Sequence, residues 1–457
     1  MRRWLRSLDA RFQAPVDGAS LAAFRVLFGL LGFVGAVRFL AYGWVERFFV
    51  APRFHFKYWG FEWVEVLSPE GMKLAFVGLA GLSLCVAAGL LYRVAIVAWL
   101  LLFTYIELID VTNYLNHYYL LSVLAAWMCF MPLGRVHGLD GWLFGGRRTV
   151  PVWMLGALRL QVGCVYFYAG IAKLTGDWLL HAQPLSIWLS ARTDAPLLGP
   201  LLAAPWAPWL MSWGGFLFDT TIPLWLSLRR TRRWAYPLVL GFHTAVGLLF
   251  NIGMFPWIMV SAATVFFDPS WPRRLLRQGA VAWPERAGAP RPLSARRLLL
   301  GAVLGAFALV QLLFPLRAFA YGGDVLWHEQ GMRWSWRVMC REKNGSVSYR
   351  VRWLGRAREL RVPPSRYLTP HQEREMSAQP DLILQLAHHI GAELAAVGHE
   401  GVEVRVDALA SLNGRRSRAL VDPEVNLLEV RDGLGPADWI LPAPQDEAPL
   451  RLARVEP

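Results

Sequence analysis

Apolar side chains occur in long runs over roughly the first 320 positions, and most charged residues lie between these runs. Runs approaching ~20 residues are typical of helices that cross a bilayer. We expect such helices near 20–42, 73–91, 94–109, 117–133, 152–173, 206–228, 236–250, 254–267 and 298–318. The pattern therefore predicts a polytopic α-helical membrane bundle with about nine transmembrane helices.

The stretch 236–267 can form one long helix or two short ones, and Gly253 and Pro256 favour a break. Loops rich in Arg and Lys stay on the cytoplasmic side of a membrane. With a cytoplasmic N-terminus, nine spans put these Arg-containing loops on that side: 134–150, 229–233 and 269–297. A single helix through 236–267 would move the last loop outside, so the basic residues favour nine spans.

The pattern changes near position 319, where shorter segments replace the long apolar runs. Residues 346–353 and 402–408 alternate like strands, whereas 381–394 has helical spacing. We predict a transmembrane helical domain over 1–318. A small mixed α/β or β-rich extramembrane domain follows over 319–457, with a poorly ordered tail after Pro442.

Composition supports a membrane location, because the mean hydropathy is +0.34 and 55% of the residues are hydrophobic. The net charge of +14 is typical of some nucleic-acid-binding proteins. Much of this charge, however, lies in short clusters beside apolar runs, where it orients membrane segments. The expected partner is therefore the lipid bilayer and not nucleic acid.

Cysteine and histidine spacing argues against a metal or disulfide site. Three of the four cysteines lie inside apolar runs, and Cys340 is the single cysteine after position 319. His388 and His389 are adjacent and would diverge on a helix. We expect no metal cofactor.

Four ionisable side chains lie in or at the ends of apolar runs, where a charge costs roughly 2.5 to 3.5 kcal/mol. They are Lys173, His117, His243 and Asp219. In the nine-span arrangement, Lys173 and His117 lie at outer helix ends. At ~1.5 Å per residue, His243 lies roughly 10 Å below the outer edge. Three proton-handling groups are thus expected toward one leaflet.

Structural explanations for the same four residues remain open. A lysine at the end of a span commonly extends to the headgroups, and a histidine there commonly forms an interfacial hydrogen bond. His243 and Asp219 could form a polar contact between helices. Position alone favours the structural interpretation. The occurrence of these groups at one depth makes the catalytic and structural interpretations about equally weighted, but it identifies no reaction.

Several strings resemble those of one known family, in the same order along the chain. They are FKYWGFEW at 56–63, NHYY at 116–119, YFYAGIAK at 166–173 followed by Asp177 and Trp178, FNIGMFP at 250–256, and GMRWSW at 331–336. They resemble motifs of the vitamin K-dependent gamma-glutamyl carboxylase family. The chain looks like a short bacterial-type member that has a horizontally transferred transmembrane (HTTM) domain.

The resemblance implies a reaction and residue roles. In the family, a lysine acts as base on vitamin K hydroquinone, and oxygen converts the anion to a stronger base that removes a proton from the γ-carbon of a glutamate. Carbon dioxide adds to that carbon, and the quinone leaves as its epoxide. Lys173 carries over as the lysine base and His117 as the histidine that assists carboxylation. Quinone or substrate contacts are expected from His243, Asn116, Tyr166, Tyr168, Asp177, Trp178, Asp219 and Met254.

The resemblance also implies partners and a location. We expect reduced vitamin K or menaquinol, O2 and CO2 as co-substrates, and a glutamate-containing protein or peptide as substrate. The short form indicates a bacterial inner-membrane protein with a cytoplasmic N-terminus and a periplasmic C-terminal domain. The sequence specifies neither the glutamyl substrate nor the oligomeric state.

Other functions remain open. Ala172 stands where the animal motif has a second lysine, and a hydroquinone epoxidase without carboxylation is one alternative. A non-catalytic membrane scaffold or lipid-binding protein is another. A transporter is a weaker alternative, because the apolar runs show no inverted repeat.

Overall fold

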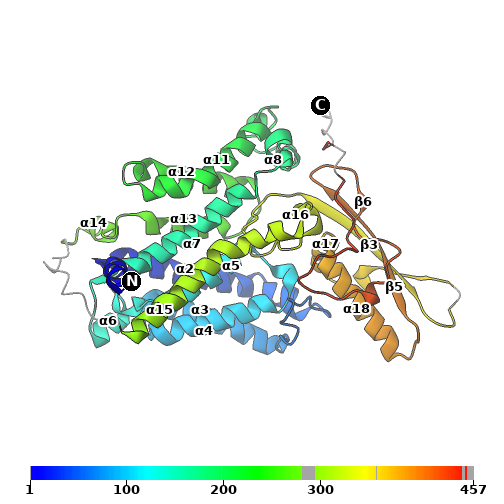
Figure 1. The fold of residues 1–457 in the computed structure, drawn as a ribbon, viewed down its shortest axis with the longest axis horizontal. Coiled ribbons are helices and arrows are strands. Elements are labelled where there is room, and N and C mark those ends of the chain that lie inside the picture. The colour runs from blue at the N-terminus through cyan, green and yellow to red at the C-terminus, as the bar shows by residue number, and fades with distance from the viewer. Residues whose placement is uncertain (1, 197, 280–293, 357, 445–447, 450–457) are drawn as a thin grey trace.

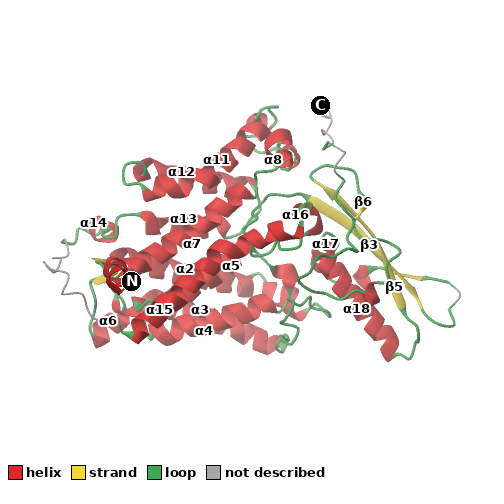
Figure 2. Cartoon of the chain, in the orientation of Figure 1, coloured by secondary structure: helices red, strands yellow, loops and turns green. Residues whose placement is uncertain are grey.

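The computed structural model describes the chain except for residues 1, 197, 280–293, 357, 445–447 and 450–457. A bundle of helices fills one side of the molecule, and a small sheet lies at the other end beside two helices (Figure 1; Figure 2). Much of the expected disordered tail falls outside the described residues.

Each of the nine apolar runs contains a helix. These are α2 (Ala19–Ala41), α3 (Pro69–Ala88), α4 (Tyr92–Leu108), α5 (Asn116–Cys129), α7 (Val152–Ile171), α11 (Ala207–Ser227), α12 (Arg232–Leu249), α13 (Phe255–Ala263) and α15 (Ala295–Leu313). The expected break within 236–267 is present, because α12 ends at Leu249 and Gly253 has a positive φ of 60°. A positive φ is easily adopted by glycine and interrupts a helix.

The prediction of nine transmembrane helices is not supported. Within the described part of the chain, four helices are long and apolar enough to cross a membrane: α2, α3, α7 and the helix Ala295–Tyr321, in which η5 (Phe314–Tyr321) continues α15. The helices α5 and α13 have 14 and 9 residues. At ~1.5 Å per residue, both are too short to cross a hydrocarbon core of ~30 Å without help from neighbouring segments. The runs are apolar as expected, but turns shorten several of the helices.

Short elements connect the longer helices. They are α1 (Arg2–Phe12), α6 (Leu139–Phe144), α8 (Gly176–His181), α9 (Leu185–Ser190), α10 (Gly199–Leu202), α14 (Trp271–Leu275), α16 (Val325–His328), and the paired strands β1 (Pro15–Asp17) and β2 (Thr149–Pro151). Glycine permits close packing of α2 on α3, since a Cβ at Gly29 would lie 2.5 Å from the carbonyl oxygen of Ser83. Such contacts between small residues are typical of packed membrane helices.

The C-terminal part contains a four-stranded antiparallel sheet in the order β4-β3-β5-β6. The strands are β3 (Lys343–Arg352), β4 (Leu360–Val362), β5 (Glu403–Leu412) and β6 (Arg418–Ala419), and the adjacent helices are α17 (Pro370–Met376) and α18 (Pro380–Ala396). Leu382, Leu386 and Ile390 of α18 are buried in the core beside the sheet. The two predicted strands and the predicted helix are therefore confirmed.

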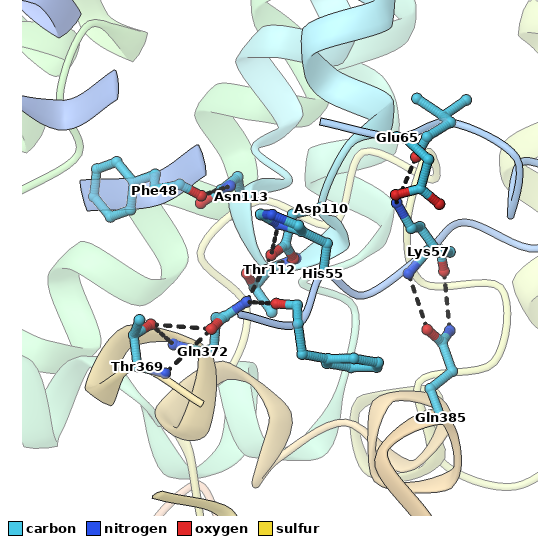
Figure 3. Close-up of polar contacts among 12 residues, drawn as sticks. Phe48, His55, Lys57, Glu65, Asp110, Thr112, Asn113, Thr369, Gln372 and Gln385 are labelled. Atoms are coloured by element: carbon cyan, nitrogen blue, oxygen red, sulfur yellow. Dashed lines mark hydrogen bonds and ion pairs between the residues drawn. The ribbon is translucent and has the colours of Figure 1, made fainter. Parts of the chain in front are cut away.

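A buried polar network joins the C-terminal part to loops of the helical bundle (Figure 3). The carboxylate of Asp110, which is fully buried, accepts hydrogen bonds from the backbone N–H and the hydroxyl of Thr112 at 2.9 and 2.7 Å. It also accepts one from Nε2 of Gln372 in α17 at 2.8 Å and lies 3.3 Å from Nδ1 of His55. A buried carboxylate requires such partners, so the network holds α17 against the bundle.

A second link lies beside this network (Figure 3). The backbone N–H of Lys57 donates to Oε1 of Gln385 at 2.9 Å, and the Gln385 amide donates back to the Lys57 carbonyl at 2.9 Å. The C-terminal hydrophobic core also includes Phe56 and Val111 from loops of the bundle. The core thus draws residues from both sides of position 319, and the proposed domain boundary remains a prediction.

Candidate functional site

Lys173 lies two residues beyond the end of α7 and forms a buried ion pair with Asp219 of α11. Its Nζ donates to Oδ2 of Asp219 at 2.8 Å and to the carbonyl of Ala169 at 3.0 Å. The two charged residues are 5% and 6% exposed. The lysine therefore points into the protein and does not extend to the surface.

Close packing of α7 on α11 brings the ion pair together. A Cβ added at Gly170 would lie 2.4 Å from a side-chain carbon of Thr220 and 2.9 Å from its backbone nitrogen. A larger residue would push the two helices apart next to Asp219. Gly170, which precedes Lys173 by three positions, is thus required for the local geometry.

Tyr166 and His243 form a second polar pair close to the first. The Tyr166 hydroxyl lies 2.8 Å from Nε2 of His243, and both residues are buried. Tyr166 lies in α7, seven positions before Lys173, and both side chains line the same cavity. Within the described structure, Nδ1 of His243 has no hydrogen-bond partner.

These two pairs line one small cavity, which we call the lysine cavity. Its volume is about 70 Å³, and its walls include Lys173, Asp219, Tyr166, His243 and Trp178. The Lys173 ammonium also lies 5.2 Å from the centre of the Trp178 ring. The two charged side chains are almost fully buried, so bulk water has little access to the ion pair.

His117 lines a larger neighbouring cavity of about 650 Å³, which we call the histidine cavity. Asn116 and Met254, also expected from the sequence, line it as well. The remaining wall is largely apolar and includes Leu31, Ala36, Phe39, Phe49, Phe76, Leu79, Phe103 and Ile258. Such a mostly apolar space with a few polar groups is typical of small-molecule sites.

Phe255 separates the two cavities. Its ring centre lies 6.0 Å from that of His117 and 5.8 Å from that of His243. Phe255, Val338 and Met339 line both cavities. The lysine and the two histidines therefore line two neighbouring cavities that share a wall.

Two residues expected at the site lie elsewhere. Asp177 binds Arg415 through two ion-pair contacts of 2.6 Å and accepts from Nδ2 of Asn413 at 2.9 Å. Tyr168 donates its hydroxyl hydrogen to the carbonyl of Leu312. Asp177 and Tyr168 line neither the lysine cavity nor the histidine cavity.

Residues 338 and 339 were not expected from the sequence as part of the cavity walls. The carbonyl oxygen of Val338 lies 3.4 Å from Nζ of Lys173, so this loop covers the ion pair. Three nearby residues have positive φ: Trp334 at 61°, Trp336 at 58° and Met339 at 48°. Such backbone conformations cost free energy in non-glycine residues and persist where surrounding packing holds them. No local sequence pattern predicts these backbone conformations.

No group of three or more His, Cys, Asp or Glu side chains that could hold a metal ion occurs within the described residues. The charged side chains that line the two cavities are those of Lys173, Asp219, Glu107, Arg38, Arg47 and Arg374.

Two family models match the chain, one in its helical part and one in its C-terminal part. Residues 13–271 match the family model described as the HTTM domain, and residues 296–446 match the model described as the vitamin K-dependent gamma-carboxylase, lumenal domain. No solved structure matches the chain. The first match contains Lys173, Asp219, His117 and His243, and the second contains the loop that covers them.

Proposed function

Because this chain belongs to the vitamin K-dependent gamma-carboxylase family, we propose that it is a membrane enzyme that oxidises a hydroquinone to its epoxide and couples this to carboxylation of a protein glutamate. The hydroquinone is of the vitamin K or menaquinone type. The observation that carries the proposal is the enclosed Lys173–Asp219 pair, which shares a wall with a large apolar cavity.

The cavities fit an apolar quinone. The histidine cavity is large enough for a fused aromatic ring and part of an apolar tail, since ligand sites commonly span about 300–1,000 Å³. Phe255 and Met339 present apolar surface to both cavities, and Nδ1 of His243 lacks a partner in the described structure. A hydroquinone ring at Phe255 would have polar groups of this chain on both sides.

Lys173 is the residue we propose to receive the hydroquinone proton. An ammonium cannot accept a proton, so its Nζ must first lose one, and Oδ2 of Asp219 at 2.8 Å is placed to take it. The low exposure of both groups keeps water from competing for that proton. Tyr166 and His243 support the same wall and are proposed to orient the ring.

When bound, the hydroquinone supplies, on reaction with oxygen, the strong base that removes the γ-proton of a glutamate. His117 lies across Phe255 from His243, on the side of the larger cavity. We assign it to the glutamyl substrate, where its imidazole can hold or move a proton during carbon dioxide addition. Asn116 donates to the carbonyl of Arg337 at 3.4 Å and thereby helps to position the start of α5.

We also propose a location and a domain division for the enzyme. Basic residues at 229–233 and around 273–274 support a cytoplasmic side for these loops, with the N-terminus on the same side. The N-terminus and α14 lie at one end of the bundle and the sheet lies at the other (Figure 1). We therefore propose that the C-terminal domain, from about residue 319, lies in the periplasm of a bacterium, with the bundle in the inner membrane.

A product assay tests the function directly. Detergent-purified protein is given reduced vitamin K or menaquinol, oxygen, labelled bicarbonate and a glutamate-containing peptide. We expect quinone epoxide together with label in the peptide. Epoxide without label would retain the oxidation and remove the carboxylation, which corresponds to an epoxidase. Neither product from folded protein would overturn the catalytic proposal and favour a scaffold.

A further inference from the structure

Three arginines from distant segments line the histidine cavity where it opens. Arg38 belongs to the last turn of α2, Arg47 to the π-helix η1 (Glu46–Val50), and Arg374 to α17. Arg47 and Arg374 are exposed, so they mark the opening of the cavity and not its interior. We call these three residues the arginine opening.

The charge of this opening is not balanced. Of the described residues that line the cavity, three are arginines and Glu107 is the acidic one; Arg374 also forms an ion pair with Glu375, so an excess of one positive charge remains. Arg38 and Arg47 form no ion pair with described residues and lie over aromatic rings, at 5.2 Å from the centre of Trp44 and 5.4 Å from that of Phe48. The guanidinium groups are thus held in place while their N–H donors remain available.

The third arginine is positioned by the network that holds α17. Gln372 bonds to the buried Asp110, and the ring of its neighbour His371 lies 5.0 Å from that of Phe48 (Figure 3 shows Gln372, Asp110 and Phe48). Arg374 donates to Nδ1 of His371 at 3.3 Å and lies 3.6 Å from Glu375. Burial lowers the pKa of His371, so its ring is neutral at pH 7 and the positive charge comes from the arginines.

We propose that the arginine opening binds the carboxylates of a glutamate-rich segment of the peptide substrate. This inference rests on the proposed function and assigns the place where the substrate enters. Guanidinium groups match carboxylates through paired N–H donors. A glutamate held at the opening places the neighbouring part of the peptide in the cavity that contains His117.

The same arginines could hold the phosphate of an anionic phospholipid, because Arg38 lies at the end of an apolar helix. Two observations favour the peptide. Arg374 comes from α17, which lies beside the sheet outside the apolar helices. In addition, lipid acyl chains in the cavity would occupy the apolar walls that the hydroquinone requires.

Binding of a labelled peptide tests the assignment without turnover. A short fluorescein-labelled peptide with several glutamates is titrated with the full-length protein in neutral detergent, and fluorescence polarisation gives its Kd. We expect Arg38→Gln, Arg47→Gln and Arg374→Gln each to raise Kd roughly threefold to tenfold. The triple variant should raise it on the order of a hundredfold. Higher ionic strength should weaken binding to wild type more than to the triple variant.

Matched controls make the result specific. Arg356→Gln removes one exposed positive charge outside the cavity and should leave Kd unchanged, whereas Arg47→Lys should recover part of the affinity. A peptide with glutamine in place of glutamate should bind weakly to every form. Wild-type Kd in a folded triple variant would overturn the inference.

Lipid binding is measured in parallel with nanodiscs that contain phosphatidylglycerol or only phosphatidylcholine. A triple variant that loses the preference for phosphatidylglycerol and keeps its peptide Kd would also overturn the inference. Failure of the proposed function can be distinguished from failure of this inference. The first appears as absence of epoxide in the wild-type assay, whatever the value of the peptide Kd.

Discussion

The two cavities differ in size and in the charged groups that line them, although they share Phe255 as a wall. The lysine cavity is about 70 Å³ and is built around a buried ion pair, whereas the histidine cavity is about 650 Å³ and opens between exposed arginines. The low exposure of Lys173 and Asp219 limits competition from water for a proton that passes between them. The histidine cavity has room for a bound small molecule or part of a peptide. The difference separates the proposed proton-handling step from the proposed binding of substrates.

The largest expected effect comes from removing the lysine. Lys173→Ala should lower the rate of quinone epoxide formation by roughly 10²–10⁴-fold, since a positioned base contributes about this much. Wild type and variant are each incubated with menaquinol or reduced vitamin K, and the epoxide formed is measured by chromatography. Full activity in a folded Lys173→Ala variant would exclude its role as the base.

The ion pair can also be broken by replacing its acidic partner, Asp219. Asp219→Ala leaves Lys173 buried without its carboxylate and should lower the free energy of unfolding by about 3–5 kcal/mol. The double variant Lys173→Met/Asp219→Leu should recover much of that loss, because no unpaired charge remains. Thermal unfolding in detergent checks both. Equal stability of Asp219→Ala and wild type would show that the pair is open to water.

Asp177 provides a contrast outside both cavities. Asp177→Ala removes charge-assisted contacts with Arg415 and Asn413 and should cost about 1.5–3 kcal/mol of stability. Activity per folded molecule should stay close to that of wild type. A selective rise in the hydroquinone KM, with stability unchanged, would instead restore the quinone-binding role expected from the sequence.

The smallest expected effect tests the shared wall. Phe255→Ala should join the two cavities, so a bound ring would lose its fixed position between the two histidines. We expect the ratio of carboxylated peptide to epoxide to fall by about tenfold, because misplacement by a fraction of an ångström weakens coupling. Phe255→Leu keeps an apolar partition and serves as the control. An unchanged ratio in Phe255→Ala would show that the partition is not required.

Local patterns in the sequence predicted much of the fold. Hydrophobic periodicity located the helices, the break near Gly253 and the strands around Tyr349 and Val404, because helix and strand geometry follow from nearby residues. The prediction of nine transmembrane helices is not supported, for a related reason. Hydropathy measures how apolar a run is, whereas turns within or beside the run decide how long each helix becomes.

The sequence by itself also singled out Lys173, Asp219, His117 and His243 as candidate site residues, since an ionisable side chain among apolar residues needs a specific reason. Only the tertiary structure decided how they are grouped. The pairing of Lys173 with Asp219 depends on two helices that are far apart in the chain. The wall between the two cavities depends on Phe255 and on a loop with positive φ angles. Asp177 lines neither cavity and instead forms an ion pair with Arg415. Contacts between distant segments leave no local periodicity, so packing alone determines which groups share a cavity.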